Sequence, residues 1–124
     1  MKLKVLSLVI LFFGLTSCLK NQADGVQVLD VAKYEKKMVQ PDVQLVDVRT
    51  PEEYDEGFIE NAILIPNETI NEAPTELPDK DAVILVYCRS GNRSRQAANK
   101  LVDLGYTNIY DFGGIIDWPY EIVD

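Results

Sequence analysis

The chain of 124 residues contains no histidine, which excludes several familiar kinds of active site. Ser-His-Asp and Cys-His catalysis both need an imidazole, and most zinc sites include one among their ligands. Basic residues are also scarce: 12 Lys and Arg against 20 Asp and Glu give a formal net charge of −8, which argues against nucleic acid as a partner. Internal repeats and low-complexity tracts are absent too, and the length suits one domain with one core.

Cysteine occurs only twice, and the first cysteine follows a targeting-like segment. Lys2 and Lys4 precede an apolar run, residues 5–15, that is too short to span a bilayer. Leu-Thr-Ser-Cys at 15–18 looks like a bacterial lipobox, in which the cysteine thiol receives a diacylglyceryl group and becomes the first mature residue. We therefore expect a lipoprotein signal peptide at 1–17 and a lipidated tether at 18–25. The protein would then be lipid-anchored to a membrane of the bacterial cell envelope, facing the periplasm or the exterior.

Two other interpretations of this segment stay open. It can be an ordinary secretory signal that leaves Cys18 in the mature chain, or the uncleaved apolar tail of a cytoplasmic protein. Lipidation would consume Cys18 and leave Cys88 as the only thiol. No intramolecular disulfide would then form, even in an oxidising compartment.

The second cysteine lies between a predicted strand and a predicted helix. Residues 82–87 form an unbroken apolar run, typical of a strand that is buried on both faces of a parallel sheet. A helix is predicted to begin near Arg93 or Ser94 and to end at Gly105. One face of this helix is apolar: Ala97, Ala98, Leu101 and Leu104. The loop that begins at Cys88 therefore lies at the carboxyl edge of the sheet, where open α/β folds bind ligands.

The composition of this loop favours an anion at Cys88. The helix directs its free N–H groups and its positive dipole end toward the loop, which also contains three arginines, at 89, 93 and 95. Gly91 and Asn92 permit the left-handed backbone that turns successive N–H groups inward. Such surroundings stabilise the nucleophilic thiolate. The alternative is a buried, inert cysteine beside arginines that are merely solvated, but three arginines within seven residues favour the nucleophile.

The sequence Cys-Arg-Ser-Gly-Asn-Arg-Ser at 88–94 resembles the active-site loop of single-domain rhodaneses, the thiosulfate sulfurtransferases. The resemblance covers about residues 26–120 and implies that Cys88 is the catalytic nucleophile. It also implies a substrate-binding loop of Arg89, Ser90, Gly91, Asn92, Arg93 and Ser94. Asp47 and Arg49 match supporting residues of the family, and we expect them to pair with each other and with loop N–H groups. Glu53 is an alternative partner for Arg49.

Residues 57–66 follow the family pattern with two departures. Phe58 stands where histidine is common, and Asn61 stands where glycine is common. Asparagine is the non-glycine residue that best tolerates a positive φ, so the turn at Asn61 can persist. The loss of a polar group at Phe58 need not damage a site whose chemistry depends on the cysteine loop.

The alternation of strand and helix patterns predicts an α/β domain over residues 26–124. We expect a mostly parallel five-stranded sheet with helices on both faces, which is also the rhodanese-like fold that the resemblance implies. Helices are predicted at 30–38, from Thr50 and Pro51 onward, and as a short element at 67–73. Gly113 and Gly114 are expected to form a tight turn beside the active loop, and Trp118 to be a packing residue.

The resemblance implies sulfur transfer through a Cys88 persulfide, from thiosulfate or a similar sulfane donor to cyanide or a thiol. It implies no cofactor, no metal and a monomeric chain, with a small anionic donor as partner. A cysteine-dependent phosphatase or arsenate reductase of the same fold is the alternative enzyme. Cysteine phosphatases need Cys-x5-Arg, however, and Ser94 stands at that position here, with Arg93 and Arg95 on either side. A membrane-anchored sulfur carrier, or a binding module, is the third interpretation.

Overall fold

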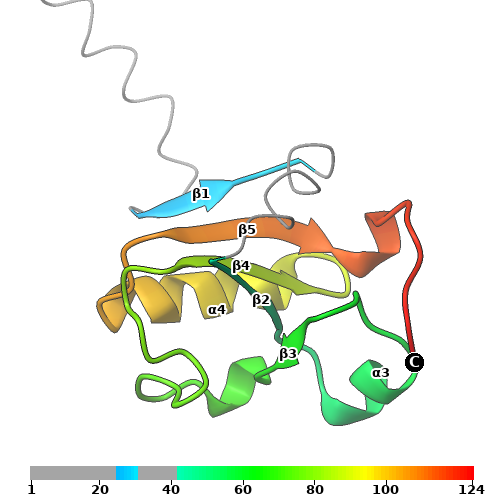
Figure 1. Cartoon of the computed structure of the whole chain (residues 1–124), viewed down its shortest axis with the longest axis horizontal. Coiled ribbons are helices and arrows are strands. Elements are labelled where there is room, and N and C mark those ends of the chain that lie inside the picture. Colours follow the sequence, from blue (N-terminus) through cyan, green and yellow to red (C-terminus); the bar gives the residue numbers. More distant parts are fainter. Residues whose placement is uncertain (1–24, 31–41) are drawn as a thin grey trace, which may run out of the picture.

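The computed structural model describes residues 25–30 and 42–124, which build a parallel sheet of five strands (Figure 1). The strands are β1 (Val26–Val28), β2 (Val43–Asp47), β3 (Ile63–Leu64), β4 (Val83–Cys88) and β5 (Ile109–Gly114). Their spatial order is β1-β5-β4-β2-β3, and each neighbouring pair is parallel. The apolar run that becomes β4 therefore lies in the middle of the sheet, and its last residue is the second cysteine.

Parallel neighbours cannot be joined by a hairpin, so each connection needs a crossover segment. In the described part, the segments between strands contain α3 (Pro51–Asp55), the 3-10 turn η3 (Asn67–Thr69) and α4 (Asn92–Asp103). A second 3-10 turn, η4 (Ile115–Asp117), follows β5. The α/β fold with a parallel five-stranded sheet is confirmed.

Helical segments contribute to both faces of the sheet. The buried cluster on one face includes Ala97, Ala98 and Leu101 of α4, which lies along the sheet in Figure 1. The cluster on the other face includes Tyr54 of α3 and Ile115 of η4. Successive residues of β4 belong alternately to the two clusters, as the period of two in a strand requires. The prediction of helices on both faces is therefore confirmed.

The helix after β4 agrees closely with its sequence signals. It begins at Asn92, slightly before the predicted start, and Gly91 occupies the N-cap position. It ends at Asp103, and Gly105 has a φ of +102°, the left-handed conformation expected of a glycine that terminates a helix. The apolar face of α4 therefore packs on the sheet, and its N-terminus lies at the cysteine loop.

The predicted short helix at 67–73 is wrong in length, because only the 3-10 turn Asn67–Thr69 forms. Tertiary contacts explain the difference. Asn67 is buried, and the Lys100 ammonium donates to its carbonyl oxygen at 2.8 Å and to its side-chain Oδ1 at 3.0 Å. Ile70 then takes an extended conformation and is itself buried, which ends the turn. The predicted helix at 30–38 falls, apart from Asp30, outside the described residues.

Two further observations concern the sequence signals. Asn61 has a φ of +75°, so the turn expected at this departure from the family pattern is preserved. Within residues 25–30 and 42–124, no helix is long and apolar enough to cross a membrane.

Candidate active site

The carboxyl end of β4 places Cys88 at the N-terminus of α4. The Cys88 side chain is buried, and the Gly91 backbone N–H donates a hydrogen bond to its Sγ at 3.0 Å. Gly91 has a φ of +110°, a conformation that would be strained for any residue with a side chain. This conformation directs the Gly91 N–H toward the sulfur. The structure thus brings together the features predicted to stabilise a thiolate: a helix N-terminus, an inward N–H group and a left-handed glycine.

The end of β5 supports the cysteine loop from the neighbouring strand. After an irregularity in the register, Cys88 pairs with Gly114, and the Ile116 N–H donates to the Arg89 carbonyl oxygen at 3.2 Å. A Cβ on Gly114 would lie 2.6 Å from the Ser90 Cα, so only glycine allows this approach. The predicted tight turn at Gly113 and Gly114 is therefore wrong, because both residues belong to β5 and Gly114 serves the contact with the loop.

Ser94 lies behind the loop, fully buried. Its hydroxyl donates to the Gly91 carbonyl oxygen at 3.1 Å and lies 3.4 Å from the Gly113 carbonyl oxygen. These bonds join the first turn of α4 to the active loop and to β5. Ser94 therefore holds the loop in shape, whereas Arg89, Ser90 and Asn92 are exposed where a ligand can reach them.

Arg93 extends from α4 to α3, where it forms a bidentate ion pair with Glu53. The two nitrogen–oxygen distances are 2.7 and 3.0 Å. The Thr50 N–H also donates to Glu53, at 3.0 Å, as part of a capping box that begins α3. Glu53 was expected to compete for Arg49, and that alternative is wrong. The spacing of three residues between Thr50 and Glu53 is the sequence signal of a capping box. It predicts that the Glu53 carboxylate lies at the start of α3.

Asp47 and Arg49 form the buried pair that the sequence predicts. The Arg49 guanidinium donates to Asp47 at 2.7 Å, and the Arg49 N–H donates to the same carboxylate at 2.9 Å. Arg49 also donates to the Gly57 carbonyl oxygen at 2.7 Å. This network connects the end of β2 to the segment at 57–59 and contains no contact with the sulfur. Its role is to support the carboxyl edge of the sheet.

Phe58 packs where the family commonly has histidine. Its ring stacks on Tyr54 with centroids 4.0 Å apart, and its backbone pairs with Val123 in an isolated antiparallel bridge. Trp118 packs as expected, 6.0 Å from the Phe112 ring. Both aromatic residues therefore fix the C-terminal segment to the domain. No cluster of three potential metal ligands occurs within residues 25–30 and 42–124.

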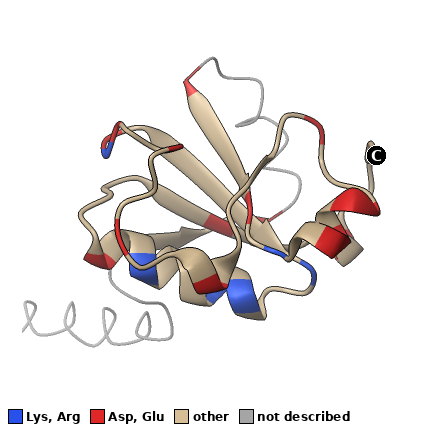
Figure 2. Ribbon diagram, turned by 90° about the horizontal axis from the view of Figure 1, so that it is seen from below, with Lys and Arg blue, Asp and Glu red and all other residues tan. Residues whose placement is uncertain are grey.

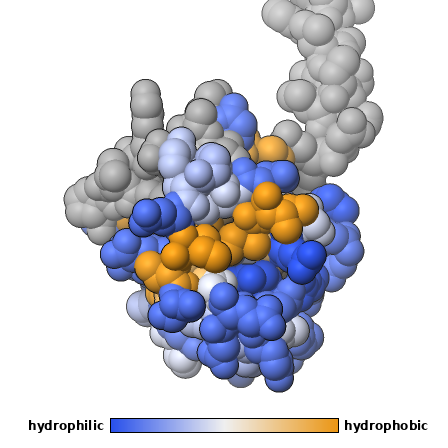
Figure 3. All heavy atoms as spheres, turned by 90° about the vertical axis from the view of Figure 1, so that its right-hand side faces the viewer, coloured by the Kyte–Doolittle hydropathy of each residue, from blue (hydrophilic) through white to orange (hydrophobic). Residues whose placement is uncertain are grey.

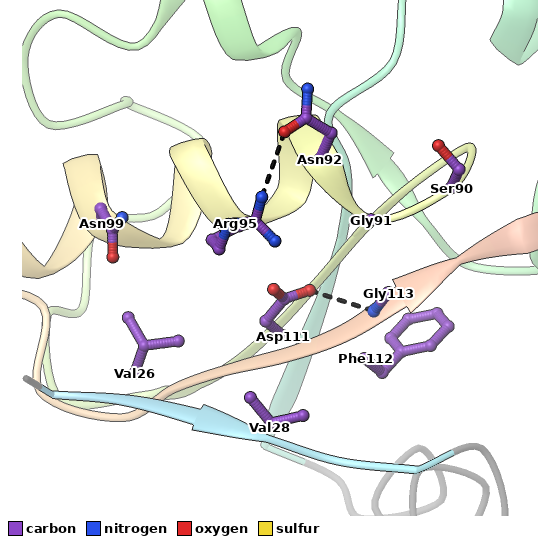
Figure 4. A pocket seen from close by; sticks show the side chains of 10 residues that line it. All are labelled: Val26, Val28, Ser90, Gly91, Asn92, Arg95, Asn99, Asp111, Phe112 and Gly113. Atoms are coloured by element: carbon purple, nitrogen blue, oxygen red, sulfur yellow. Dashed lines mark hydrogen bonds between the residues drawn. The ribbon is translucent and has the colours of Figure 1, made fainter. Parts of the chain in front are cut away.

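A cavity of about 480 Å³ lies beside the loop, between α4 and the β1–β5 edge (Figure 4). Ser90 and Gly91 of the loop line it, with Arg95 and the buried Asp111 facing in from α4 and β5. Burial raises the pKa of Asp111, against hydrogen bonds from Ser94 and Gly113 that lower it. Cys88 is not among the residues that line this cavity.

The carboxyl edge of the sheet around the cysteine loop, which we call the active edge, has a basic part and an acidic part. Basic residues lie along α4 and its loop, whereas α3 is acidic (Figure 2). The pKa of Glu53 is lowered to about 2, mainly by its hydrogen bonds from Arg93 and further by those from Thr50. The pKa of Arg93 is raised, mainly by its hydrogen bonds to Glu53. Glu53 thus holds the Arg93 guanidinium between α3 and the start of α4.

We expect Glu53→Gln to lower the free energy of unfolding by about 1–2 kcal/mol at pH 7. A carboxylate whose pKa is lowered by folding stabilises the protein above its unfolded pKa, near 4.5, and this contribution is lost as the pH falls toward 2. The difference between wild type and variant should therefore shrink between pH 5 and pH 2. Urea unfolding at several pH values measures it, with the exposed neighbour in Glu52→Gln as control. An equal difference at all pH values would contradict the ion pair.

Comparison of the sequence with known proteins shows the family of this chain. The chain belongs to the rhodanese-like domain family, which matches residues 30–119. It is 45% identical over 78 residues to a sulfurtransferase of Allochromatium vinosum, covering 62% of this chain and 72% of that protein. It is 40% identical over 73 residues to the thiosulfate sulfurtransferase PspE of Escherichia coli, covering 58% and 70%.

The fold of solved rhodaneses agrees as well. The structure described as rhodanese with anions from E. coli superposes with a TM-score of 0.61 at 35% identity. The match covers 66% of this chain and 98% of that one. The resemblance of the cysteine loop to single-domain rhodaneses, stated from the sequence, is thereby confirmed for family and fold.

Proposed function

We propose that this protein is a thiosulfate sulfurtransferase, which takes sulfane sulfur from thiosulfate or a similar anionic donor onto Cys88. The single observation that carries the proposal is the setting of the Cys88 Sγ. It accepts the Gly91 N–H at the N-terminus of α4, in a loop of rhodanese sequence. The similarity to sulfurtransferases supports the reaction class.

In the first half-reaction, the Cys88 thiolate attacks the outer sulfur of thiosulfate. The sulfur–sulfur bond of thiosulfate breaks, sulfite leaves with the bonding electron pair, and Cys88 retains a persulfide. In the second, cyanide or a thiolate attacks the outer persulfide sulfur and Cys88 leaves as thiolate. No step needs a general base, because the loop N–H and the helix end stabilise the anionic sulfur directly.

Mass spectrometry of the purified chain tests this function. After incubation with thiosulfate, the peptide that contains Cys88 should gain one sulfur atom, and cyanide should remove it. The same preparation should not hydrolyse p-nitrophenyl phosphate measurably, because the loop is one residue shorter than the phosphatase pattern. Phosphatase turnover without a persulfide would reverse this assignment.

We also propose that the chain acts as a monomer on a membrane of the bacterial cell envelope, anchored by lipid on Cys18 and facing the periplasm or the exterior. The lipobox-like Leu-Thr-Ser-Cys and the apolar run before it support this location. Two or more acyl chains are enough for stable anchoring, whereas one is marginal.

Expression of the full chain in a bacterium tests the anchor. Wild type should partition into detergent, and Cys18→Ala should not, while Cys88→Ala should partition as wild type does. A soluble wild-type chain that still begins with Met1 would rule out lipidation.

A further inference from the structure

An exposed apolar surface adjoins the active loop, at the carboxyl edge of the sheet. Ile116 is 59% exposed, Ile122 49% and Val123 36%. We call these three side chains the C-terminal surface. Figure 3 views the molecule from the side on which the C-terminus lies and shows apolar atoms grouped among hydrophilic ones. Grouped apolar side chains that remain in water next to a site are typical of a docking surface.

The C-terminal surface is held in place rather than carried on a loose tail. Val123 and Phe58 exchange two backbone hydrogen bonds of 2.8 Å. Ile122 lies so close to Gly57 that a Cβ there would come within 2.8 Å of its Cδ1. Ile116 is tied to the active loop through the Arg89 carbonyl oxygen. A partner that covers these side chains would therefore contact the rim of the Cys88 loop.

The two chain segments that carry and flank the C-terminal surface bear negative charge only, whereas the exposed Arg89 lies on the loop that Ile116 contacts. The bridge between Phe58 and Val123 joins two segments, 51–60 and 115–124, that contain no Lys or Arg. Their exposed carboxylates are Glu52, Asp55, Glu56, Glu60, Asp117, Glu121 and Asp124. The one other carboxylate, Glu53, is occupied by Arg93. Figure 2 shows α3, which carries part of this charge, beside the active edge.

We propose that the C-terminal surface docks the sulfur acceptor, and that this acceptor is a protein segment with a cysteine among basic and apolar side chains. The inference rests on the sulfur transfer proposed above. Apolar contact would supply affinity, and the carboxylates would select and steer a cationic partner. Nucleic acid and anionic lipid carry the wrong charge for this surface. A second copy of the chain would bring the same carboxylates against it.

The transfer step balances without a further reactant. The acceptor's cysteine thiolate attacks the outer sulfur of the Cys88 persulfide. The bond from that sulfur to the Cys88 Sγ breaks, and Cys88 leaves as thiolate with the electron pair. The acceptor then holds the persulfide. Cyanide is too small to contact the C-terminal surface while it reacts at the sulfur. The rate of sulfur transfer to cyanide should therefore not depend on that surface.

Three blocked pentapeptides serve as probes of this acceptor: Lys-Leu-Cys-Leu-Lys, Glu-Leu-Cys-Leu-Glu and Lys-Ser-Cys-Ser-Lys. The full chain is loaded with thiosulfate, and the kcat/KM for persulfide transfer to each peptide is measured by mass spectrometry. Each value is divided by the rate at which the same peptide attacks a small disulfide, which corrects for the reactivity of its thiol. The basic leucine peptide should exceed the acidic one by about tenfold or more, and the serine peptide should lie between them.

Variants locate the effect on the molecule. Ile116→Ser and Ile122→Ser should each lower transfer to the basic leucine peptide about five- to tenfold and leave the cyanide rate unchanged. Combined Glu52→Gln, Asp55→Asn and Glu56→Gln should do the same and weaken the salt dependence. The matched controls are Val28→Ser, at a side chain 60% exposed on β1, and Glu72→Gln with Glu76→Gln, on an exposed connection. Neither control should change transfer.

Several outcomes would overturn the docking proposal. Equal corrected rates for the three peptides would do so, as would a fall in the cyanide rate that matches the fall in peptide transfer. A dimer that Ile116→Ser dissociates would assign the C-terminal surface to a second copy. Binding of the Cys18→Ala chain to phosphatidylcholine vesicles that depends on Ile116 would assign it to lipid. Failure of the sulfurtransferase proposal is recognised separately, because Cys88 would then gain no sulfur from thiosulfate at all.

Discussion

Replacing Cys88 by serine is expected to lower thiosulfate:cyanide sulfur transfer by at least about a thousandfold while the fold remains intact. Serine is close to cysteine in size, and its oxygen can accept the Gly91 N–H that now donates to the sulfur. A serine alkoxide, however, forms far less readily than a thiolate at neutral pH, and the product of attack would not be a persulfide. The cyanide assay measures the loss, and circular dichroism with urea unfolding checks the fold.

The second cysteine supplies the control for this experiment. Cys18→Ser should retain full transfer when assayed in solution, because Cys18 lies in the segment that precedes the domain. Activity that survives in Cys88→Ser but disappears in Cys18→Ser would show that the sulfur is carried on the other thiol. Full activity in both variants would show that Cys88 is not required for transfer.

Replacing Gly114 by alanine is expected to cost about 2–4 kcal/mol of stability and to reduce sulfur transfer by about a hundredfold. The new Cβ would lie 2.6 Å from the Ser90 Cα and 2.7 Å from the Arg89 carbonyl carbon, and neither is the end of a flexible side chain. The cysteine loop must therefore move away from β5. That movement displaces the Gly91 N–H from the sulfur, so the variant should be slower in forming the persulfide as well as easier to unfold.

Gly113→Ala is the matched control for this change. A Cβ on Gly113 meets nothing within 4 Å, although its φ of +100° makes any side chain unfavourable there. We expect a loss of about 1 kcal/mol in stability and little loss of activity. The persulfide rate and urea unfolding are measured for both variants. Equal behaviour of the two would mean that backbone strain, rather than contact with the loop, explains the glycine pair.

Local signals account for much of the fold and for the position of Cys88. The apolar run before Cys88, the glycine at 91 and the stop at Gly105 each act within a few residues, so strand, loop and helix follow directly from the sequence. The pair Asp47 and Arg49 was predictable for the same reason, because two residues of separation leave little choice of partner. The turn at Asn61 is another local outcome.

The misplaced elements share a different cause. The stretch at 67–73 has weak local preferences, and its conformation is set by Lys100, which is 33 residues away from Asn67. The glycines at 113 and 114 read as a turn, because a glycine pair usually marks one. Both lie in β5 instead, where Gly114 lets the strand approach the loop after Cys88, a contact that no spacing in the sequence reveals. Such features depend on which backbones meet after the sheet has formed.

By itself, the sequence determined that this is an α/β chain with one buried strand that ends in a cysteine at the start of a helix, because periodicity and helix stops act over short distances. Only the tertiary structure decided the partner of Arg93, since a charged side chain in an acidic protein has many candidates and the placement of α3 brings Glu53, 40 residues away, to the start of α4. It also decided that residues 115–124 lie beside 51–60, which gathers their apolar side chains and carboxylates at the active edge. Long-range pairing of this kind is set by the geometry of the assembled sheet, and local propensity carries no information about it.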